Sequence, residues 1–430
     1  MNIIEKDKAY VWHPFTPQKN MQSPIAIIKG KNTLLFDEEN NTYIDAISSW
    51  WVTLHGHGNK YIAKAIYQQA LTIEQVIFAG FTHAPAVNLA QQLLPILPGK
   101  MHKIFYSDNG STSTEVALKM AIQYWWNIEG KDTKRKKIIA FNNAYHGDTF
   151  GAMSVSDRSV FTLAFQQHLF EVIFIDAPTE HNIENLFEVI ELHKNDIAAF
   201  IYEPLVQGAG GIKMYAAQCM DSLLQKMKQY QIICIADEVM TGFGRTGTLF
   251  ASEQLITKPD IICLSKGLTG GTMALGVTAC NENIYNAFVT DNKLQTFFHG
   301  HSFTANPLAC TAALASLHLL LQQKTLKKIT WITDENKRVA ASFSAYNFVK
   351  NIRCLGTILA FEIVIGEDAY LNSISQTVTN FCMKKGVFIR PLGNTFYWMP
   401  PYCITKQEFA KMFKTTHAML LHLQKMLPNN

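Results

Sequence analysis

Two residues that each follow a short apolar segment could together hold a cofactor. Asp237 ends the run Ile232-Ile-Cys-Ile-Ala-Asp, and Lys266, 29 residues later, ends Ile261-Ile-Cys-Leu-Ser-Lys. In an open α/β sheet, ligands bind at the carboxyl ends of the strands. A lysine amine there can condense with an aldehyde, and an aspartate one strand away can keep a pyridine nitrogen protonated. The pair therefore predicts a pyridoxal 5′-phosphate (PLP) site, although each residue alone is more often a loop cap or a surface charge.

A third segment could hold the phosphate of such a cofactor. A strand-like run at residues 103–107 leads through a small polar loop into a helical pattern, with apolar side chains at Val116, Met120 and Tyr124. Thr112 and Glu115 form a capping-box pattern at the helix start. Free N–H groups at Gly110 and Ser111, with the positive end of the helix dipole, would bind a phosphate. An ordinary capped helix is the alternative interpretation.

Tyr145 is a candidate for the aromatic face of the site. It lies in Asn143-Ala-Tyr-His-Gly-Asp, directly after another strand-like run. Its ring could lie on a pyridine ring, although taken alone it would be read as a core tyrosine.

Two other kinds of site were weighed and are not expected. The segment Gly242-Phe-Gly-Arg-Thr-Gly has the letters of a dinucleotide fingerprint, but it neither follows a strand directly nor opens a helix. The histidine pairs His55 with His57 and His299 with His301 have no cysteine or carboxylate at ligand spacing beside them. We therefore expect neither a nucleotide role for the glycine-rich segment nor a metal site.

The elements that would position these residues form an α/β pattern. Short apolar segments, rich in β-branched and aromatic residues, alternate with helical patterns at residues 103–106, 137–141, 172–175, 197–202, 232–236 and 261–264. Most lack apolar–polar alternation, which is typical of strands that helices cover on both faces. The pattern predicts a mostly parallel sheet.

Beyond about residue 323 the pattern changes to strand-like pieces at residues 358–364, 387–390 and 395–399, with a turn at Leu392-Gly-Asn. We interpret this part as a smaller α+β domain that packs with the N-terminal segment. The predicted division is 1–55 for the N-terminal segment of the small domain, 56–322 for the large PLP-binding domain and 323–430 for the rest of the small domain.

Composition excludes several classes of function. The chain has 430 residues, 48% hydrophobic and 17% charged, and its net charge of +4 is scattered, so a nucleic-acid surface is not expected. Residues 1–10 lack the apolar core of a secretory signal, and no apolar run reaches the roughly 18 residues of a membrane span. The eight cysteines form no Cys-x-x-Cys pair and suggest buried thiols. These features together predict a cytoplasmic enzyme.

With these residues in place, the chain resembles the class III (ω-type) aminotransferases, which are PLP-dependent transferases of fold-type I. Ala236-Asp-Glu-Val-Met-Thr-Gly-Phe-Gly-Arg-Thr-Gly and Leu264-Ser-Lys-Gly-Leu-Thr-Gly-Gly match the family's cofactor signature, and similarity extends over nearly the whole length. Within the family, the chain is similar to members that convert 8-amino-7-oxononanoate to 7,8-diaminononanoate in biotin biosynthesis. This likeness is carried by Trp12-His-Pro-Phe-Thr, Ser48-Ser-Trp-Trp, Thr82-His-Ala-Pro-Ala, Tyr145-His-Gly-Asp-Thr-Phe-Gly-Ala-Met-Ser-Val, Val206-Gln-Gly-Ala-Gly-Gly and Ile389-Arg-Pro-Leu-Gly.

The resemblance implies a role for each cofactor residue. Lys266 would carry the cofactor and move a proton between the substrate carbon and the cofactor. Asp237 would pair with the pyridine nitrogen, while Gly110 and Ser111 would bind the phosphate. Tyr145 would stack on the ring and help to shape the substrate pocket.

The resemblance also implies residues for the substrate and for a neighbouring subunit. Trp50 would wall the pocket against the aliphatic chain of the substrate, and Arg390 would bind its distal carboxylate through a planar fork. His301 and Ser302 from the neighbouring subunit would complete the phosphate site, and Gly300 would contact the substrate. A homodimer is therefore implied for activity.

The amino donor implied by the resemblance is S-adenosylmethionine, with L-lysine as the alternative. Phe15 stands where the best-known members have tyrosine, and Gly300-His-Ser stands where they have Gly-Pro-Thr. Both features resemble the branch that uses lysine, whereas Ser48-Ser-Trp-Trp resembles the users of S-adenosylmethionine. Asp148 would help Phe15 to select the donor.

Three rival functions remain open at this stage. The chain could be another ω-aminotransferase, acting on ornithine, γ-aminobutyrate or a different terminal amine. It could be an aminomutase of the same fold, or a PLP-binding regulator that has lost turnover. A regulator would usually carry a DNA-binding extension, for which we see no spare length outside the fold.

Overall fold

A seven-stranded sheet forms the centre of the larger lobe. The structure is a computed structural model that describes residues 1–19, 21–365 and 374–426. The strands lie in the order β4 (Met101–Ser107), β12 (Gly276–Asn281), β11 (Ile261–Leu264), β10 (Ile233–Asp237), β7 (Ile197–Tyr202), β5 (Lys137–Phe141) and β6 (Val172–Ile175). Only β12 runs antiparallel to its neighbours. The expected mostly parallel α/β sheet is thus confirmed, and each predicted strand in this region is present. The sequence reading missed β12, which opens on a glycine and carries small side chains.

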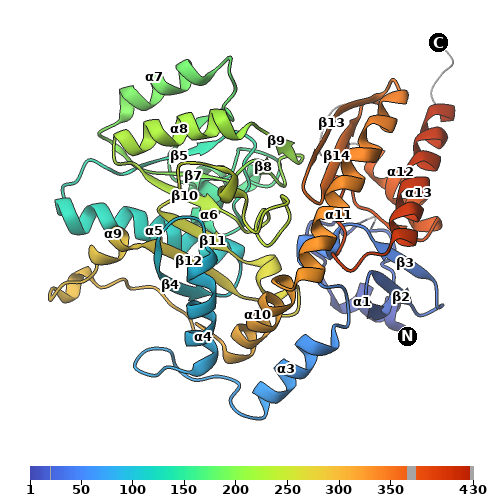
Figure 1. The fold of residues 1–430 in the computed structure, drawn as a ribbon, viewed down its shortest axis with the longest axis horizontal. Coiled ribbons are helices and arrows are strands. Elements are labelled where there is room, and N and C mark those ends of the chain that lie inside the picture. Colours follow the sequence, from blue (N-terminus) through green and yellow to red (C-terminus); the bar gives the residue numbers. More distant parts are fainter. Residues whose placement is uncertain (20, 366–373, 427–430) are drawn as a thin grey trace.

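Helices cover both faces of this sheet, as the unbroken apolar runs predict. Ala199 and Ile201 of β7 face α5 (Gly110–Glu129), whereas Phe200 and Tyr202 of the same strand face α8 (Ala217–Gln229). The alternation follows from the two-residue repeat of a strand, and it requires an apolar side chain at every position. Figure 1 shows α5 on one side of the sheet and α8 with α7 (Ile183–His193) on the other.

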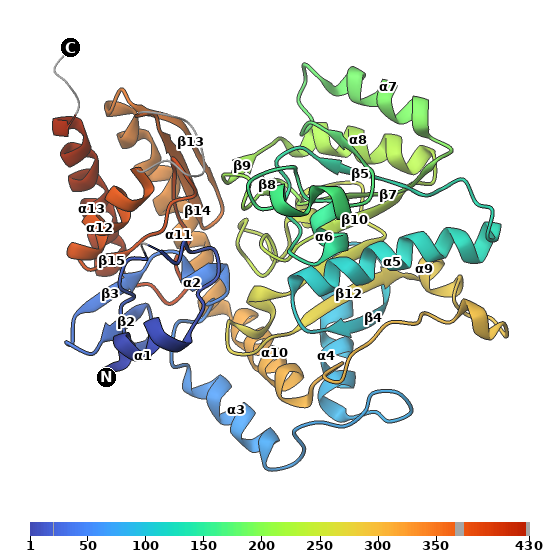
Figure 2. The same ribbon diagram turned by 180° about the vertical axis from the view of Figure 1, so that it is seen from behind.

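The smaller lobe joins the two ends of the chain. β1 (Ile27–Lys31), β2 (Leu34–Asp37) and β3 (Thr42–Asp45) form one sheet with β15 (Val387–Phe388), which lies parallel to β3. A second sheet contains β13 (Val349–Leu355), β14 (Ile358–Ile363) and β16 (Thr395–Trp398). Figures 1 and 2 show the blue N-terminal strands beside the orange and red C-terminal elements from both sides. The strand expected at 387–390 is shorter than expected, and β13 was not expected.

The remaining elements connect the lobes and cover their surfaces. The helices are α1 (Ile3–Tyr10), α2 (Ser48–Trp51), α3 (Lys60–Ala70), α4 (Ala84–Leu93), α6 (Phe150–Ser154), α9 (Glu282–Asn286), α10 (Pro307–Leu320), α11 (Gln323–Ala340), α12 (Ile374–Lys384) and α13 (Lys406–Met426). Two short strands, β8 (Val206–Gln207) and β9 (Lys213–Met214), pair with each other. Short 3₁₀ turns are η1 (Leu94–Ile96), η2 (Leu163–His168), η3 (Ala251–Gln254), η4 (Lys266–Thr269), η5 (Lys293–Gln295) and η6 (Ala341–Ala345). The division at residues 55 and 322 stays a prediction, and its second point falls between α10 and α11.

The start of α5 differs from the expected capping box. The N-cap is Asn109, three residues before Thr112, and its Oδ1 accepts the N–H of Thr112 at 3.0 Å. Thr112 Oγ1 in turn accepts the N–H of Asn109 at 3.0 Å. Glu115 takes no part in capping, because its Oε1 accepts the N–H of Gly151 at 2.6 Å. The predicted pairing of Thr112 with Glu115 was therefore wrong: asparagine is a strong N-cap, and it starts the helix earlier.

The glycine-rich segment and His57 contact other parts of the protein. The guanidinium of Arg245, in the glycine-rich segment, is buried and donates to the carbonyl oxygens of Trp51 and Pro400, so it joins the two lobes. His57 lies 2.9 Å from a carboxylate oxygen of Asp45. Among the described residues, no group of three side chains could ligate a metal, and no helix there is long and apolar enough to cross a membrane. All eight cysteines are free thiols, six of them buried.

Candidate active site

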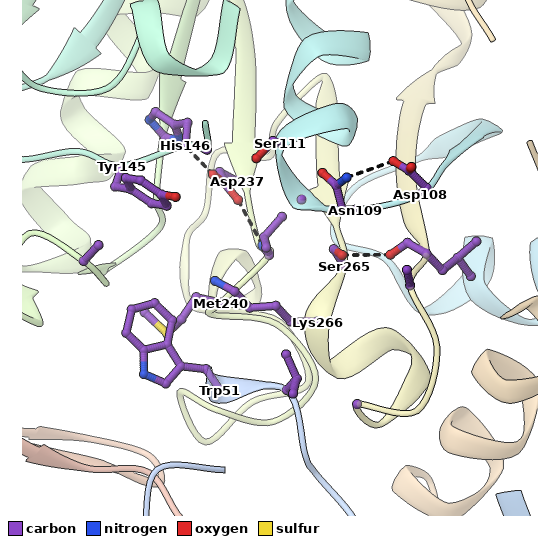
Figure 3. A pocket seen from close by; sticks show the side chains of 18 of the residues that line it. Trp51, Asp108, Asn109, Ser111, Tyr145, His146, Asp237, Met240, Ser265 and Lys266 are labelled. Atoms are coloured by element: carbon purple, nitrogen blue, oxygen red, sulfur yellow. Dashed lines mark hydrogen bonds and ion pairs between the residues drawn. The ribbon is translucent and has the colours of Figure 1, made fainter. Parts of the chain in front are cut away.

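Lys266 and Asp237 line one cavity of 490 Å³ at the carboxyl ends of β11 and β10 (Figure 3). Lys266 starts the 3₁₀ turn η4 with a φ of 45°, a left-handed backbone that few non-glycine residues adopt. Its Nζ lies 4.6 Å from the centre of the Trp51 ring. Burial lowers the pKa of the Lys266 amine to about 8, although the carboxylates of Asp237 and Glu203 oppose the shift. The amine is therefore partly neutral, and nucleophilic, near neutral pH.

Both carboxylate oxygens of Asp237 are held in place. Oδ2 lies 2.7 Å from Nδ1 of His146, and Oδ1 accepts the N–H of Val239 at 3.0 Å. An ionised carboxylate only accepts hydrogen bonds, so the proton belongs on Nδ1 of His146. His146 is itself buried, and its Nε2 has no hydrogen-bond partner among the described residues. The arrangement fixes the orientation of the Asp237 carboxylate.

A second buried carboxylate, Glu203, lies beside this pair. It follows β7, and it accepts the backbone N–H of Gly208 at 2.8 Å and that of Tyr145 at 3.2 Å. Burial raises the pKa of Glu203 to about 7; His146 opposes this rise and Asp237 adds to it. Glu203 therefore holds the backbone at Tyr145 and changes its charge near neutral pH.

The start of α5 borders the same cavity and presents backbone N–H groups to it. Gly110 and Ser111 line the cavity, and within the described part of the chain their N–H groups donate no hydrogen bond. Ser111 Oγ accepts the N–H of Asp148 at 3.0 Å. A Cβ added at Gly110 would lie 2.8 Å from Cγ1 of Val239, so only glycine fits the close approach of the two segments. Unpaired N–H groups at the positive end of a 20-residue helix suit a phosphate.

A row of aromatic rings leads from this cavity to Arg390. Tyr145 lines the cavity, and its ring centre lies 6.0 Å from that of Phe161. Phe15 follows, 5.9 Å from Phe161 and 5.4 Å from Trp50. The guanidinium of Arg390 lies 5.1 Å from the Trp50 ring. The row is an apolar wall that ends in a positive charge.

The side chains of the adjacent residues Trp50 and Trp51 lie in different parts of the site. Trp51 lines the Lys266 cavity and donates from Nε1 to the hydroxyl of Tyr397 at 2.9 Å. Trp50, the residue expected at the pocket wall, is 42% exposed and lies between Phe15 and Arg390. The positive φ angles of Ser49 (62°) and Trp51 (67°) turn the two side chains apart, which the sequence pattern does not indicate.

Arg390 lines a groove of 780 Å³ that also contains Phe15 and Phe388. The guanidinium is exposed, and it forms no ion pair with any carboxylate that the structure describes. It is thus available to an added carboxylate. Asp148 is exposed and lines a neighbouring cavity of 290 Å³ with Tyr145 and Phe161.

Gly300, His301 and Ser302 lie away from Lys266. They belong to the connection between η5 and α10, and none of them lines the Lys266 cavity. Ser302 is exposed, and its carbonyl oxygen accepts the side-chain amide of Gln75. Their expected role in a neighbouring subunit stays a prediction.

Reading the sequence missed His146, Glu203 and Trp51. His146 follows Tyr145 directly, and Glu203 follows β7 just as Asp237 follows β10. Applying the strand-end rule to every predicted strand would have found Glu203. No pattern in the sequence distinguishes Trp51 from Trp50.

Comparison with known proteins places this geometry in a family. Residues 15–420 match the family described as aminotransferase class-III. The chain is 45% identical, over 94% of its length and 96% of the relative's, to an adenosylmethionine-8-amino-7-oxononanoate aminotransferase of Synechococcus elongatus. The crystal structure of an enzyme of that name from Methanocaldococcus jannaschii has a TM-score of 0.93 and 32% identity, covering 97% of this chain and 98% of the other. An ω-transaminase from Pseudomonas jessenii, in complex with PMP, also has a TM-score of 0.93, at 26% identity over 99% of each chain.

Proposed function

Because this chain belongs to the class-III aminotransferase family, we propose that it transfers an amino group to the keto carbon of 8-amino-7-oxononanoate and so forms 7,8-diaminononanoate for biotin biosynthesis. One observation carries the proposal: a single cavity unites the amine of Lys266, the anchored carboxylate of Asp237 and the unpaired N–H groups at Gly110 and Ser111. Relatives over nearly the whole length carry the name of this activity.

The residues of the cavity fit PLP as the cofactor. Lys266 would bind its aldehyde carbon, Asp237 its pyridine nitrogen and the start of α5 its phosphate, while Tyr145 would cover one face of the ring. When bound, PLP supplies the electron sink and the temporary carrier of the amino group.

The protein's own contribution is proton transfer, orientation and charge. Because the pKa of Lys266 is lowered to about 8, its Nζ can accept a proton from the substrate carbon and return it at neutral pH. The carboxylate of Asp237, held by His146 and Val239, would keep the pyridine nitrogen of bound PLP protonated.

Acceptor recognition follows from the aromatic row. A long aliphatic keto acid can lie along Tyr145, Phe161 and Trp50, which are apolar along its path, and place its terminal carboxylate on Arg390. The planar guanidinium can bind a carboxylate with two parallel hydrogen bonds.

We propose S-adenosylmethionine as the amino donor, with L-lysine as the alternative. Asp148 borders the cavity that Tyr145 and Phe161 also line, and Phe15 borders the groove of Arg390; we expect these two residues to select the donor. The phenyl ring of Phe15 offers no hydroxyl to a donor, and its replacement by tyrosine tests that role.

We further propose a homodimer in which each subunit supplies Gly300, His301 and Ser302 to the partner's site. These residues lie away from the chain's own Lys266, and Phe298 and Phe303 around them are 71% and 61% exposed. Large exposed apolar side chains are typical of a surface that another chain covers. The eight free thiols support a reducing compartment, which we propose to be the cytoplasm.

The decisive experiment is rapid-mixing absorbance of the PLP-loaded protein with S-adenosylmethionine and, separately, with L-lysine. The acceptor 8-amino-7-oxononanoate is then added. We expect one donor to convert the cofactor spectrum to that of the amine form and the acceptor to restore it. Lys266→Ala should do neither.

Two results would change the conclusion. If neither donor reacts but another terminal amine does, the biotin-pathway reaction fails and a general ω-transaminase, as in the Pseudomonas jessenii relative, is favoured. If Lys266→Ala transaminates at the wild-type rate, the assignment of the lysine itself is wrong.

A further inference from the structure

One face of α5 binds the segment that carries the proposed phosphate residues of the partner's site. Lys119, Gln123 and Asn127 are spaced four residues apart and form a single row on the helix, which we name the α5 stripe. The segment is residues 293–302, which we name the strap. Its described residues form no β-strand, and beyond the short turn η5 its backbone forms one internal hydrogen bond, from the N–H of His299 to the carbonyl oxygen of Phe297 at 3.0 Å.

The α5 stripe holds the strap through its backbone carbonyl groups. Gln123 Nε2 donates to the carbonyl oxygens of Gln295 and Thr296, each at 3.1 Å. Asn127 Nδ2 donates to the carbonyl oxygen of Gln295 at 3.4 Å, and the side chain of Gln295 donates back to the carbonyl oxygen of Asn127 at 3.0 Å. Asn127 Nδ2 also donates to the carbonyl oxygen of Ala287, which precedes the strap, at 3.0 Å. Because most of these bonds are made to main-chain carbonyl oxygens, they fix the path of the strap's main chain.

Lys119, at the N-terminal end of the α5 stripe, contacts the strap close to Gly300, His301 and Ser302. Lys119 Nζ lies 3.0 Å from Nδ1 of His299, two residues before His301. The ring of Phe297 packs against Phe105 of β4, with 5.2 Å between ring centres. The strap is thus anchored up to residue 299 on α5 and β4.

After residue 299 the chain is held by Gln75. The side chain of Gln75 donates to the carbonyl oxygen of Ser302, and Asn306 Nδ2 donates to Oε1 of Gln75 at 3.1 Å. Ser302 and Phe303 are exposed. Residues 300–303 therefore form a tip between two anchors that is exposed except at the half-buried His301.

We propose that the α5 stripe positions this tip in the partner's cofactor site, so that Gln123 and Asn127 of one subunit set the PLP affinity of the other. The inference rests on the proposed homodimer. In this arrangement α5 contributes to two active sites. Its N-terminus borders the cavity of its own subunit, and the α5 stripe positions the strap that enters the site of the partner subunit. Gln123 lies about 20 Å along the helix from Gly110, since each residue rises about 1.5 Å. A change at the stripe should therefore leave the chain's own phosphate cradle intact.

The test uses mixed dimers with two affinity tags, in which one subunit carries Lys266→Ala and only the other can bond PLP. In the trans arrangement, Gln123→Leu and Asn127→Leu are placed in the Lys266→Ala subunit, whose strap serves the intact site. In the cis arrangement, they are placed in the subunit with intact Lys266. The measured quantity is the dissociation constant of PLP, followed by the absorbance of the lysine-bound cofactor.

We expect about a tenfold weaker PLP affinity in the trans arrangement and no change in the cis arrangement. Ile128→Gln, at an exposed position of the last helical turn, is the matched control and should change neither. Equal affinity in all dimers, or a loss only in cis, would overturn the inference while leaving the homodimer in place. A protein that is a monomer would overturn both, and size-exclusion chromatography of the holoenzyme distinguishes that case.

A second variant covers the possibility that the double substitution unfolds the chain, which the thermal midpoint of the apoprotein reports. Lys119→Met alters an exposed residue of the stripe and removes its contact with His299. It should weaken PLP binding in trans by a smaller factor, about threefold, and again not in cis. The absence of any trans effect in this folded variant would contradict the proposal.

Discussion

The Nδ1 atom of His146 lies 2.7 Å from Oδ2 of Asp237, and both side chains are buried. Val239 donates to the other oxygen of Asp237, and the same carboxylate lines the cavity of Lys266. The pair therefore fixes the orientation of the Asp237 carboxylate.

His146→Gln should weaken catalysis more than it weakens the fold. It removes a hydrogen bond to a charged group, worth about 1.5–3 kcal/mol, which corresponds to roughly tenfold to hundredfold in kcat/KM if the bond acts in the transition state. Steady-state kinetics of the PLP-saturated variant measure the loss. His181→Gln changes an exposed histidine and should behave as wild type. An unchanged kcat/KM in His146→Gln would remove the role.

Glu203 should make the stability of the apoprotein depend on pH. Its pKa is raised from 4.5 to about 7, so the folded state binds the proton more tightly than the unfolded state does. This contribution is fully present below pH 4.5 and is lost as the pH rises through about 7, a difference of about 3 kcal/mol. Thermal midpoints at pH 5 and pH 7.5 should differ less in Glu203→Gln than in wild type. Equal differences in the two proteins would contradict this origin of the pH dependence.

Lys266 should react with PLP at a lower pH than an ordinary lysine. Burial lowers its pKa from 10.5 to about 8, so the neutral amine already predominates above pH 8. The rate of PLP uptake by the apoprotein, followed by absorbance, should rise up to about pH 8 and then level off. A rate that keeps rising to pH 10 would show that the amine has an ordinary pKa.

Arg390→Ala should raise the KM for the acceptor at least tenfold, because the terminal carboxylate loses its charged partner. The effect on the donor half-reaction should be smaller than twofold if the donor does not use this guanidinium. Arg390→Lys keeps the charge without the planar fork and should lie between the two. Arg338→Ala, which removes an exposed arginine that pairs with Glu335 on α11, is the control. An unchanged acceptor KM in Arg390→Ala would exclude the contact.

Gly110→Ala should weaken PLP binding by roughly tenfold, as expected when an added methyl group overpacks a close contact by 1–3 kcal/mol. The new Cβ would lie 2.8 Å from Cγ1 of Val239, so the start of α5 must shift. Equilibrium titration of the apoprotein with PLP measures the effect. The double variant Gly110→Ala with Val239→Ala makes room and should recover part of the affinity. No loss in the single variant would mean that the helix start adjusts freely.

Some elements of the larger lobe can be predicted from the sequence and others cannot. Every position of β7 is buried, and an unbroken apolar run at a strand's length shows this directly. β12 was missed because its small residues, Gly276 among them, carry no such signal. The start of α5 was placed too late because Thr112 and Glu115 fit a capping box by spacing, while Asn109 made the bonds.

The sequence by itself determined the fold class, the residues that follow strands at one sheet edge, Asp237 and Lys266, and the loop residues Gly110 and Ser111 beside them. Burial pattern and local spacing are properties of neighbouring residues, so they can be read along the chain. Only the tertiary structure decided that His146 anchors Asp237 across 91 residues, that Gln123 holds the strap across 172, and that Trp51 rather than Trp50 faces Lys266. Such contacts depend on how distant segments pack and on single backbone angles, and no local pattern of residue types encodes them.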